Sequence, residues 1–191
     1  MKEKLNIIVT GPTSAVRMIN EILDREFGFK TFTNKDYLNI IEQTKKELSE
    51  ESLSTLDSSI PNRYILPKTR LAMMELSDDK SKVAYSGFPN DIEQMKDFEG
   101  FLYGRRHHVD LIINVTGTFE LLKQFALSNA ENYISKPIPQ EEIELIEEKI
   151  KQDKLLSEKV VNFFQGRRKV FELDLSTDDI KKNLEEALET I

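Results

Sequence analysis

Short apolar runs alternate with longer stretches of helical spacing along most of the chain. Five of the runs have the length and composition of strands that are buried on both faces of a sheet; they lie at 5–9, 29–33, 83–85, 109–115 and 169–173. Between them, apolar residues recur three and four positions apart, which is the spacing of one face of a helix. Strands that alternate with helices in this way form a parallel sheet with helices on both faces. The pattern therefore predicts a three-layer α/β/α fold with a parallel sheet of about five strands.

The helical stretches differ in length and in their end signals. The spacing predicts seven of them, at 15–27, 37–48, 70–76, 92–98, 119–127, 140–164 and 177–191. Gly28 is a natural end for the first, and Asp36 or a neighbouring residue is positioned to cap the second. The stretch 140–164 has a candidate break near Asp153. The polar, serine-rich segment 49–62 indicates a connection within one domain.

Composition narrows the class of protein. The 191 residues suffice for one domain, 1–191, with its own core. A formal net charge of −7 argues against a general nucleic-acid binder, which presents an excess of Lys and Arg on one face. The chain has no Cys, nothing resembling a signal peptide, and no run approaching the roughly 18 apolar residues of a membrane span. We therefore expect a cytoplasmic protein whose partners are small ligands or other proteins, with no nucleic acid and no membrane among them.

The segment after the first run, "GPTSAVRMI" at 11–19, has the position of a phosphate-binding loop. In such a loop, backbone N–H groups wrap the phosphates, a lysine reaches the outer phosphates and a hydroxyl binds Mg²⁺. Here Val16 stands in the place of the second glycine, Arg17 in that of the lysine and Ile19 in that of the hydroxyl. A β-branched residue disfavours the wrapping geometry, and isoleucine cannot bind a metal. We therefore expect no magnesium site in this segment.

Six further segments follow the loop, and their order along the chain is informative. They are "TNKDYLN" at 33–39, "ILPKT" at 65–69, "SGFPNDIEQMKDF" at 86–98, "VDLIINV" at 109–115, "VVNFF" at 160–164 and "QGRRKVFELDLSTDDIKKNLEEAL" at 165–188. Together with the first loop, their order and spacing resemble the adenylate kinase family of nucleoside monophosphate kinases along nearly the whole chain. The resemblance implies a P-loop-type fold with a monophosphate-binding insert at 34–70 and a short, vestigial lid at 128–139.

By this resemblance, a nucleotide would contact two loops and the helices that follow them. The implied residues are Gly11, Pro12, Ser14, Arg17, Asp36, Gly87, Phe88 and Gln94. Gln94 stands where the family reads the adenine of the monophosphate, and Phe88 is the aromatic residue of the family's "GFP" motif. The alternatives are an exposed helical glutamine and a core phenylalanine. Arg17 either contacts an anion at the start of its helix or lies exposed on the first turn.

The charged residues on which catalysis depends in that family are mostly substituted. Ser86 replaces the aspartate that precedes "GFP" and helps to organise the metal, while Asn39 and Asn90 replace two arginines. Phosphoryl transfer depends on cations that neutralise the charge spreading over the transferring group, and one such arginine is worth about 10³-fold or more in rate. No residue is therefore a confident catalytic candidate.

Few cations remain near the shortened lid. Lys123 and Lys136 are the only ones between 119 and 140, and Lys149 aligns with a later arginine of the family. We favour a degenerate, inactive adenylate-kinase-like protein that acts as a nucleotide-sensing or protein-interaction module. Its candidate ligands are ATP and AMP without Mg²⁺, and its other candidate partner is an unknown protein. The alternative is a divergent active kinase that transfers phosphoryl from ATP to AMP or another monophosphate, with Arg17 as the phosphate cation.

Two basic segments invite an interpretation as metal or anion sites. They are "GRRHHVD" at 104–110 and "RRK" at 167–169. Adjacent histidines on a loop rarely converge on one metal without further ligands, and the chain has only two. We therefore predict a solvated loop and a solvated turn.

Overall fold

The computed structural model describes residues 4–47, 67–76, 81–131, 138–177 and 179–191. The predicted serine-rich connection at 49–62 lies outside these residues, as do positions 132–137 of the predicted lid. The first residues of that lid segment continue a helix, and only Ile138 and Pro139 of its end are described as irregular chain.

Five strands form one parallel sheet. They are β1 (Leu5–Thr10), β2 (Phe29–Thr33), β3 (Lys82–Ser86), β4 (Leu111–Thr116) and β5 (Lys169–Asp174). Their order across the sheet is β2-β3-β1-β4-β5, and every neighbouring pair is parallel. The predicted parallel sheet of about five strands is confirmed.

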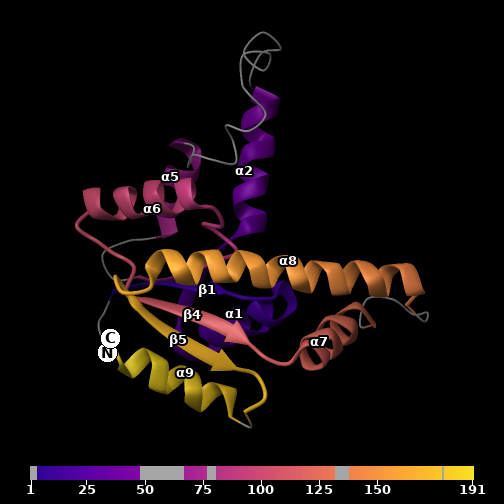
Figure 1. Ribbon diagram of the computed structural model, residues 1–191. Coiled ribbons are helices and arrows are strands. Elements are labelled where there is room, and N and C mark those ends of the chain that lie inside the picture. Colours follow the sequence, from indigo (N-terminus) through magenta and orange to yellow (C-terminus); the bar gives the residue numbers. More distant parts are fainter. Residues whose placement is uncertain (1–3, 48–66, 77–80, 132–137, 178) are drawn as a thin grey trace.

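Helices cover both faces of this sheet (Figure 1). They are α1 (Thr13–Phe27), α2 (Asn34–Glu47), α5 (Pro67–Leu76), α6 (Ile92–Gly104), α7 (Phe119–Glu131), α8 (Gln140–Phe164) and α9 (Ile180–Glu189). Helices α1 and α9 lie on one face, whereas α6 and α8 lie on the other, with α2 and α5 beside the edge strand β2. The predicted three layers are therefore present.

The two faces of the sheet bury separate apolar clusters. Along β1, side chains alternate between them: Leu5, Ile7 and Val9 pack with α1 and α9, whereas Ile8 packs on the other side with residues of α6 and α8. This alternation is the two-residue period of a strand. Because all six residues of β1 are buried, the strand is covered from both faces.

Three local predictions are refined by the structure. Helix α1 begins at Thr13, two positions before the predicted start, and α8 continues through Asp153 without a break. Helix α2 also begins earlier, because Thr33 and Asp36 cap each other. The Asp36 carboxylate accepts hydrogen bonds from the backbone N–H (2.8 Å) and the hydroxyl (2.7 Å) of Thr33, and the Asp36 N–H donates to the Thr33 hydroxyl oxygen.

The connections that follow β1, β3 and β4 all leave the sheet at the edge formed by the carboxyl ends of the strands. Strand β1 lies in the middle of the sheet, and the chain passes to β2 and β3 on one side of it and to β4 and β5 on the other. In open α/β sheets, ligands bind outside the carboxyl ends of the strands at such a switch point. The candidate site is therefore sought around the loop after β1.

Candidate functional site

The loop between β1 and α1 consists of Gly11 and Pro12 alone. Gly11 has a φ of +137°, and a Cβ at this position would lie 2.6 Å from the carbonyl oxygen of Val115 in β4. Glycine is required here because β4 passes too close for any side chain and because L-residues avoid this conformation. Pro12 precedes the first helical residue, with a φ of −58° that leads into the helix. Both predicted residues thus have structural roles.

The backbone that would wrap a phosphate is already helical. Helix α1 starts at Thr13, and the N–H of Val16 donates to the carbonyl oxygen of Pro12 at 2.9 Å. In a functional phosphate-binding loop, the residues between the first glycine and the lysine position form the cradle. Here those residues form the first turn of α1, with Val16 buried in the core. The cradle is replaced by a helix start.

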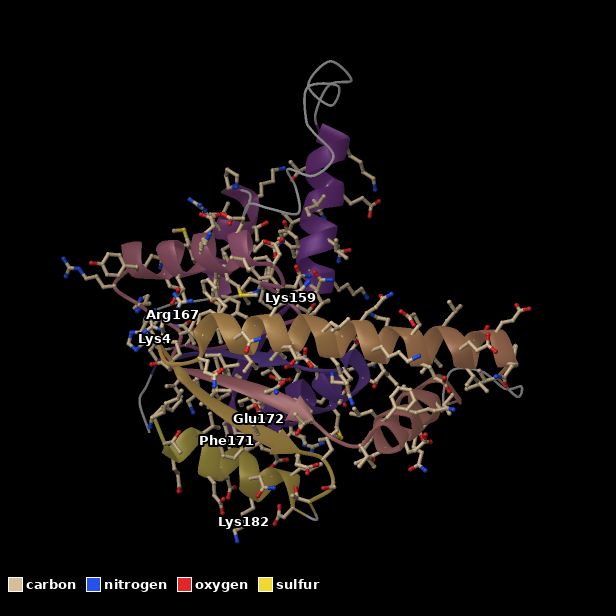
Figure 2. All side chains as sticks on the ribbon, viewed as in Figure 1. Lys4, Lys159, Arg167, Phe171, Glu172 and Lys182 are labelled. Carbon is tan, nitrogen blue, oxygen red and sulfur yellow. The ribbon has the colours of Figure 1, made fainter. Side chains whose placement is uncertain are left out.

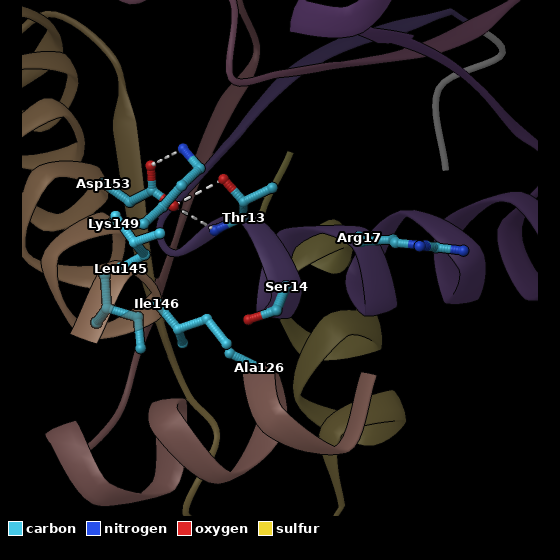
Figure 3. Close-up of a pocket in the computed structure, with 9 residues that line it drawn as sticks. Thr13, Ser14, Arg17, Ala126, Leu145, Ile146, Lys149 and Asp153 are labelled. Atoms are coloured by element: carbon cyan, nitrogen blue, oxygen red, sulfur yellow. Dashed lines mark hydrogen bonds and ion pairs between the residues drawn. The ribbon is translucent and has the colours of Figure 1, made fainter. Parts of the chain in front are cut away.

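A carboxylate from α8 occupies the beginning of α1 (Figure 3). Asp153 Oδ2 accepts hydrogen bonds from the Thr13 N–H at 2.8 Å and from the Thr13 hydroxyl at 2.7 Å. Asp153 is 7% exposed. A helix N-terminus attracts negative charge, because its first N–H groups have no partner within the helix and its dipole is positive there. The Asp153 carboxylate therefore supplies, from within the chain, the anion that this position favours.

Arg17 does not join this arrangement. Its guanidinium pairs with Glu21 one turn further along α1, with 3.3 Å between Nε and Oε1. Its side chain is 59% exposed and extends away from Thr13 and Asp153 (Figure 3). Arg17 therefore occupies the lysine position of the motif without reaching the place where phosphates would lie. Whether Arg17 contacts an anion stays a prediction.

Two further cations beside the cavity, Lys123 and Lys149, also have carboxylate partners. Lys123 of α7 pairs with Glu147 of α8, and this contact raises the pKa of Lys123 and lowers the pKa of Glu147. Lys149, which aligns with the family's later arginine, donates from Nζ to Asp153 Oδ1 at 3.0 Å. Lys136 of the predicted lid lies outside the described residues. Positive charge at this end is thus matched locally by negative charge.

A cavity of about 370 Å³ lies beside the start of α1, between α7 and α8. Its lining combines four aliphatic residues, Ala126, Leu145, Ile146 and Ile150, with five polar or charged ones, Thr13, Ser14, Arg17, Lys149 and Asp153. Ser14, another predicted contact, is part of this wall, and Figure 3 shows its hydroxyl directed toward the cavity. The mixed lining suits an apolar group better than a polyphosphate, because a triphosphate needs several cations around it.

The residues after β3 are tied to the core instead of lining an opening. Ser86 is 4% exposed, and its hydroxyl donates to Oδ1 of Asn20 on α1 at 2.8 Å. Gly87 has a φ of +63°, a left-handed conformation that favours glycine. Ser86 thus replaces a metal-organising carboxylate with a hydrogen bond between β3 and α1.

Phe88 is the centre of an aromatic cluster. Its ring is fully buried, and the ring centroids lie 4.7 Å from Tyr37, 5.4 Å from Phe32 and 6.2 Å from Phe98. Such tilted and edge-on contacts are favourable arrangements for aromatic rings. Phe88 is therefore the core phenylalanine of the two alternatives.

Gln94 is buried, which neither sequence alternative anticipated. It is 2% exposed; its Oε1 accepts from the N–H of Asn90 at 3.1 Å, and its Nε2 donates to the hydroxyl of Tyr37 at 3.4 Å. Its own N–H donates to the Asp91 carboxylate, which caps α6. Burial raises the pKa of Tyr37 to about 12. The side chain that would read an adenine is therefore engaged in holding the loop 90–94 against α2.

The remaining predicted positions lie apart from this centre. Asp36 caps α2 through Thr33, as described above, and Asn39 is exposed on the same helix. The structure brings Gly11, Pro12 and Ser14 together at the start of α1 and brings Gly87, Phe88 and Gln94 together beside α2 and α6. The described residues contain no group of three or more His, Cys, Asp and Glu side chains that could hold a metal ion.

Sequence reasoning missed Asp153 and Thr13, although a signal was present. The buried face of α8 includes Ile150, Asp153, Ser157, Val160 and Phe164, at helical spacing. A carboxylate on the apolar stripe of an amphipathic helix is rare unless a partner satisfies it. That position therefore indicated a buried interaction, where we had inferred a break in the helix.

Comparisons with known proteins identify the fold. A gluconokinase from Sinorhizobium meliloti 1021 has a similar crystal structure, with a TM-score of 0.55 and 12% sequence identity over 99% of this chain and 92% of that chain. At this identity the likeness shows the fold alone, a parallel five-stranded sheet with helices on both faces. No protein-family model matches the sequence, and no curated protein is significantly similar to it. Among the described helices, none is both long and apolar enough to cross a membrane.

Proposed function

We propose that this chain is a non-catalytic protein of the P-loop kinase fold that acts as a protein-interaction module. The observation that carries the proposal is the position of Asp153, whose carboxylate accepts two hydrogen bonds from Thr13 at the start of α1. An anionic phosphate and this carboxylate would compete for the same N–H group, and their like charges would repel each other. In this protein the Asp153 carboxylate accepts the hydrogen bond at the start of α1 that a bound phosphate would accept in an active kinase.

The charge balance around the cavity supports the same conclusion. A nucleoside triphosphate is stabilised by cations that are available to it, among them Mg²⁺ and several Lys or Arg side chains. Arg17 and Lys149, the two cations of the cavity wall, pair with Glu21 and Asp153 within α1 and α8. To bind a polyphosphate, each would have to exchange its carboxylate partner for the ligand. Replacing one anionic partner by another in this way adds little to the free energy of polyphosphate binding.

The half of the site that would hold AMP supports an interaction role over nucleotide sensing. To read an adenine, Gln94 would have to leave the Asn90 N–H and the Tyr37 hydroxyl, both of which lie in or beside the core. Exposing unpaired buried polar groups costs about 1–3 kcal/mol for each group. We therefore propose that neither half of the family-like site binds its nucleotide group.

The proposal is tested by assaying the purified protein with ATP and Mg²⁺, using AMP as one acceptor and gluconate as another, because the structural neighbour is a gluconokinase. We expect no ADP formation above the rate without protein, and no rise in melting temperature with ATP, AMP or a two-headed adenosine polyphosphate. Turnover that is lost in Arg17→Ala would instead identify an active kinase with Arg17 as its phosphate cation. A shift with AMP alone would identify a nucleotide sensor.

A variant tests the role of Asp153 directly. Asp153→Ala removes the acceptor of both Thr13 hydrogen bonds, and we expect the free energy of unfolding to fall by about 1.5–3 kcal/mol, as for hydrogen bonds to a charged group. Because the start of α1 is then without an anion, pyrophosphate should raise the melting temperature of the variant more than that of the wild type. Glu158→Ala, which removes an exposed carboxylate from the same helix, is the matched control and should change neither quantity. Equal pyrophosphate shifts in wild type and Asp153→Ala would contradict the proposed competition.

A further inference from the structure

The opposite edge of the sheet, formed by the amino ends of the strands, gathers arginines from two connections. Helix α6 leads through Arg105 and Arg106 to β4, and α8 leads through Arg167 and Arg168 to β5. Strands β4 and β5 are neighbours, with Leu111 paired to Lys169, so the two connections meet at one edge. We call the following residues the amino-edge patch: Tyr103, Arg105, Arg106, His108, Arg167 and Arg168. Figure 2 shows Arg167 at this end of the molecule.

Two arginines of the patch are held in place by one carboxylate. Glu99 of α6 accepts from Arg167 Nη1 at 3.0 Å and from Arg168 Nη2 at 3.3 Å. The Arg167 guanidinium also lies over the ring of Phe163, 4.0 Å from its centroid. Planar guanidinium groups fixed in this way lose little freedom on binding a carboxylate. These two arginines are therefore held in place before a partner arrives. Because they share a single carboxylate, the three side chains keep a net positive charge, unlike the one-to-one ion pairs of the cavity wall.

The patch also contains an exposed aromatic side chain, that of Tyr103. Tyr103 is 82% exposed, the highest exposure among the large hydrophobic side chains of the described residues. It lies four residues after Glu99 on α6, and residues with this spacing share a face of a helix. Tyrosine and arginine are the residue types enriched in the energetic centres of protein interfaces.

Arg106 adopts a backbone conformation that the fold alone would assign to glycine. Its φ is +59°, and among the described residues it is the one non-glycine residue with positive φ. The Arg106 N–H donates to Tyr103 O and the His107 N–H donates to Leu102 O, which is the hydrogen-bond pattern of a helix end that usually has glycine in the left-handed position. Glycine would adopt this conformation with less strain, so stability does not account for an exposed arginine here.

We propose that the amino-edge patch binds an acidic segment of a partner protein, with Tyr103 as the central contact and Arg106 as a specificity residue. The patch collects four arginines from two neighbouring connections, and two of these arginines share Glu99, in a chain whose net charge is −7. The surrounding negative charge disfavours a long polyanion such as nucleic acid, whereas a short acidic segment extends only over the positive area. The inference rests on the proposed interaction role, for which it names the surface and the class of partner.

The test measures fluorescence anisotropy of a labelled twelve-residue peptide of Glu and Asp with two Leu residues, titrated with full-length protein at low salt. We expect a dissociation constant in the micromolar range and weakening by about 10-fold in Tyr103→Ala, as for a central interface residue. Arg106→Gly should weaken binding by about 5-fold or more. The same variant should keep or raise the melting temperature, because glycine relieves the left-handed conformation.

Controls separate this patch from general charge and from other partner classes. Lys151→Ala removes an exposed cation of α8, and Leu155→Ala removes an exposed apolar side chain; both should leave peptide binding unchanged. Peptide binding that is equal in wild type and Arg106→Gly overturns the proposal, as does an absence of binding at millimolar protein. Tighter binding of an oligothymidine or of phosphatidylserine vesicles than of the peptide also overturns it. Kinase turnover would refute the proposed function, but the peptide-binding results would still decide whether the patch binds an acidic segment.

Discussion

The two segments that resemble the nucleotide site of the adenylate kinase family are held within the protein in different ways. At the start of α1, residues of the motif are substituted, and the Asp153 carboxylate accepts two hydrogen bonds from Thr13. Beside α2 and α6, the motif residues Gly87, Phe88 and Gln94 are retained, but they are packed into the core or hydrogen-bonded within it. Residues that match a binding motif can therefore have structural roles, and their presence does not by itself indicate a binding site. The comparison teaches that the chain resembles the family most at residues that stabilise the fold.

The physical reason for the difference lies in what each residue does without a ligand. An aromatic side chain in the core contributes burial whether or not a nucleotide is present. A lysine, a magnesium-binding hydroxyl or an arginine beside phosphates contributes to binding and chemistry, and adds little to the packing of the core. Under the proposed function no nucleotide binds, so only the first kind of residue contributes to the stability of the protein.

Phe88→Ala should have the largest effect on stability, because Phe88 belongs to the half that is retained for packing. We expect the free energy of unfolding to fall by about 3–5 kcal/mol, from lost burial and the cavity left among Phe32, Tyr37 and Phe98. Urea denaturation followed by circular dichroism measures the change. Ile92→Ala, on the neighbouring helix with 50% exposure, is the matched control and should cost far less. A small loss at Phe88 would mean that the "GFP" motif is kept for some reason other than the core.

Gly11→Ala tests whether the first glycine of the phosphate-binding segment is kept for the same structural reason. The new Cβ would meet the carbonyl oxygen of Val115 at 2.6 Å in a conformation with φ of +137°. Overpacking together with backbone strain should cost about 2–4 kcal/mol in the free energy of unfolding.

The matched control for this change is Gly100→Ala. Gly100 lies within α6, and a Cβ there has no neighbouring atom within 4 Å. Alanine in a helix should stabilise the protein by about 0.5–1 kcal/mol relative to glycine. If both alanine variants behave alike, the close approach of β4 is not what maintains Gly11.

The sequence predicted the layers and strands of this fold because they follow from periodicity. Apolar runs such as 5–9 and 169–173 have few alternatives to a buried strand once helices alternate with them. The same reasoning placed α1 two residues late. The helix start at Thr13 depends on the Asp153 carboxylate, which comes from a position 140 residues further along the chain.

The candidate site was less predictable for a related reason. The helical spacing placed Gln94 in a helix, as the structure has it, but it could not tell that Gln94 is 2% exposed. That burial depends on Tyr37, which belongs to another helix. Whether a polar side chain faces a ligand or an internal partner is decided by tertiary packing, which periodicity along one segment does not report.

The smallest of the predicted effects is a loss of stability at high pH that distinguishes the retained half. Burial raises the pKa of Tyr37 from its usual 10 to about 12. Between these values the unfolded chain releases the phenol proton while the native protein keeps it, so the free energy of unfolding falls as the pH rises from 10 to 12, by up to about 2 kcal/mol. Tyr37→Phe should remove this part of the decline.

Burial also raises the pKa of Tyr85, so Tyr85→Phe should act in the same direction and the double variant should have the flattest profile of stability against pH. Urea denaturation at pH 8, 10 and 11.5 measures the difference between wild type and each variant. Parallel profiles of wild type and Tyr37→Phe would mean that the Tyr37 hydroxyl is open to solvent, and that the half of the site around Gln94 is not closed.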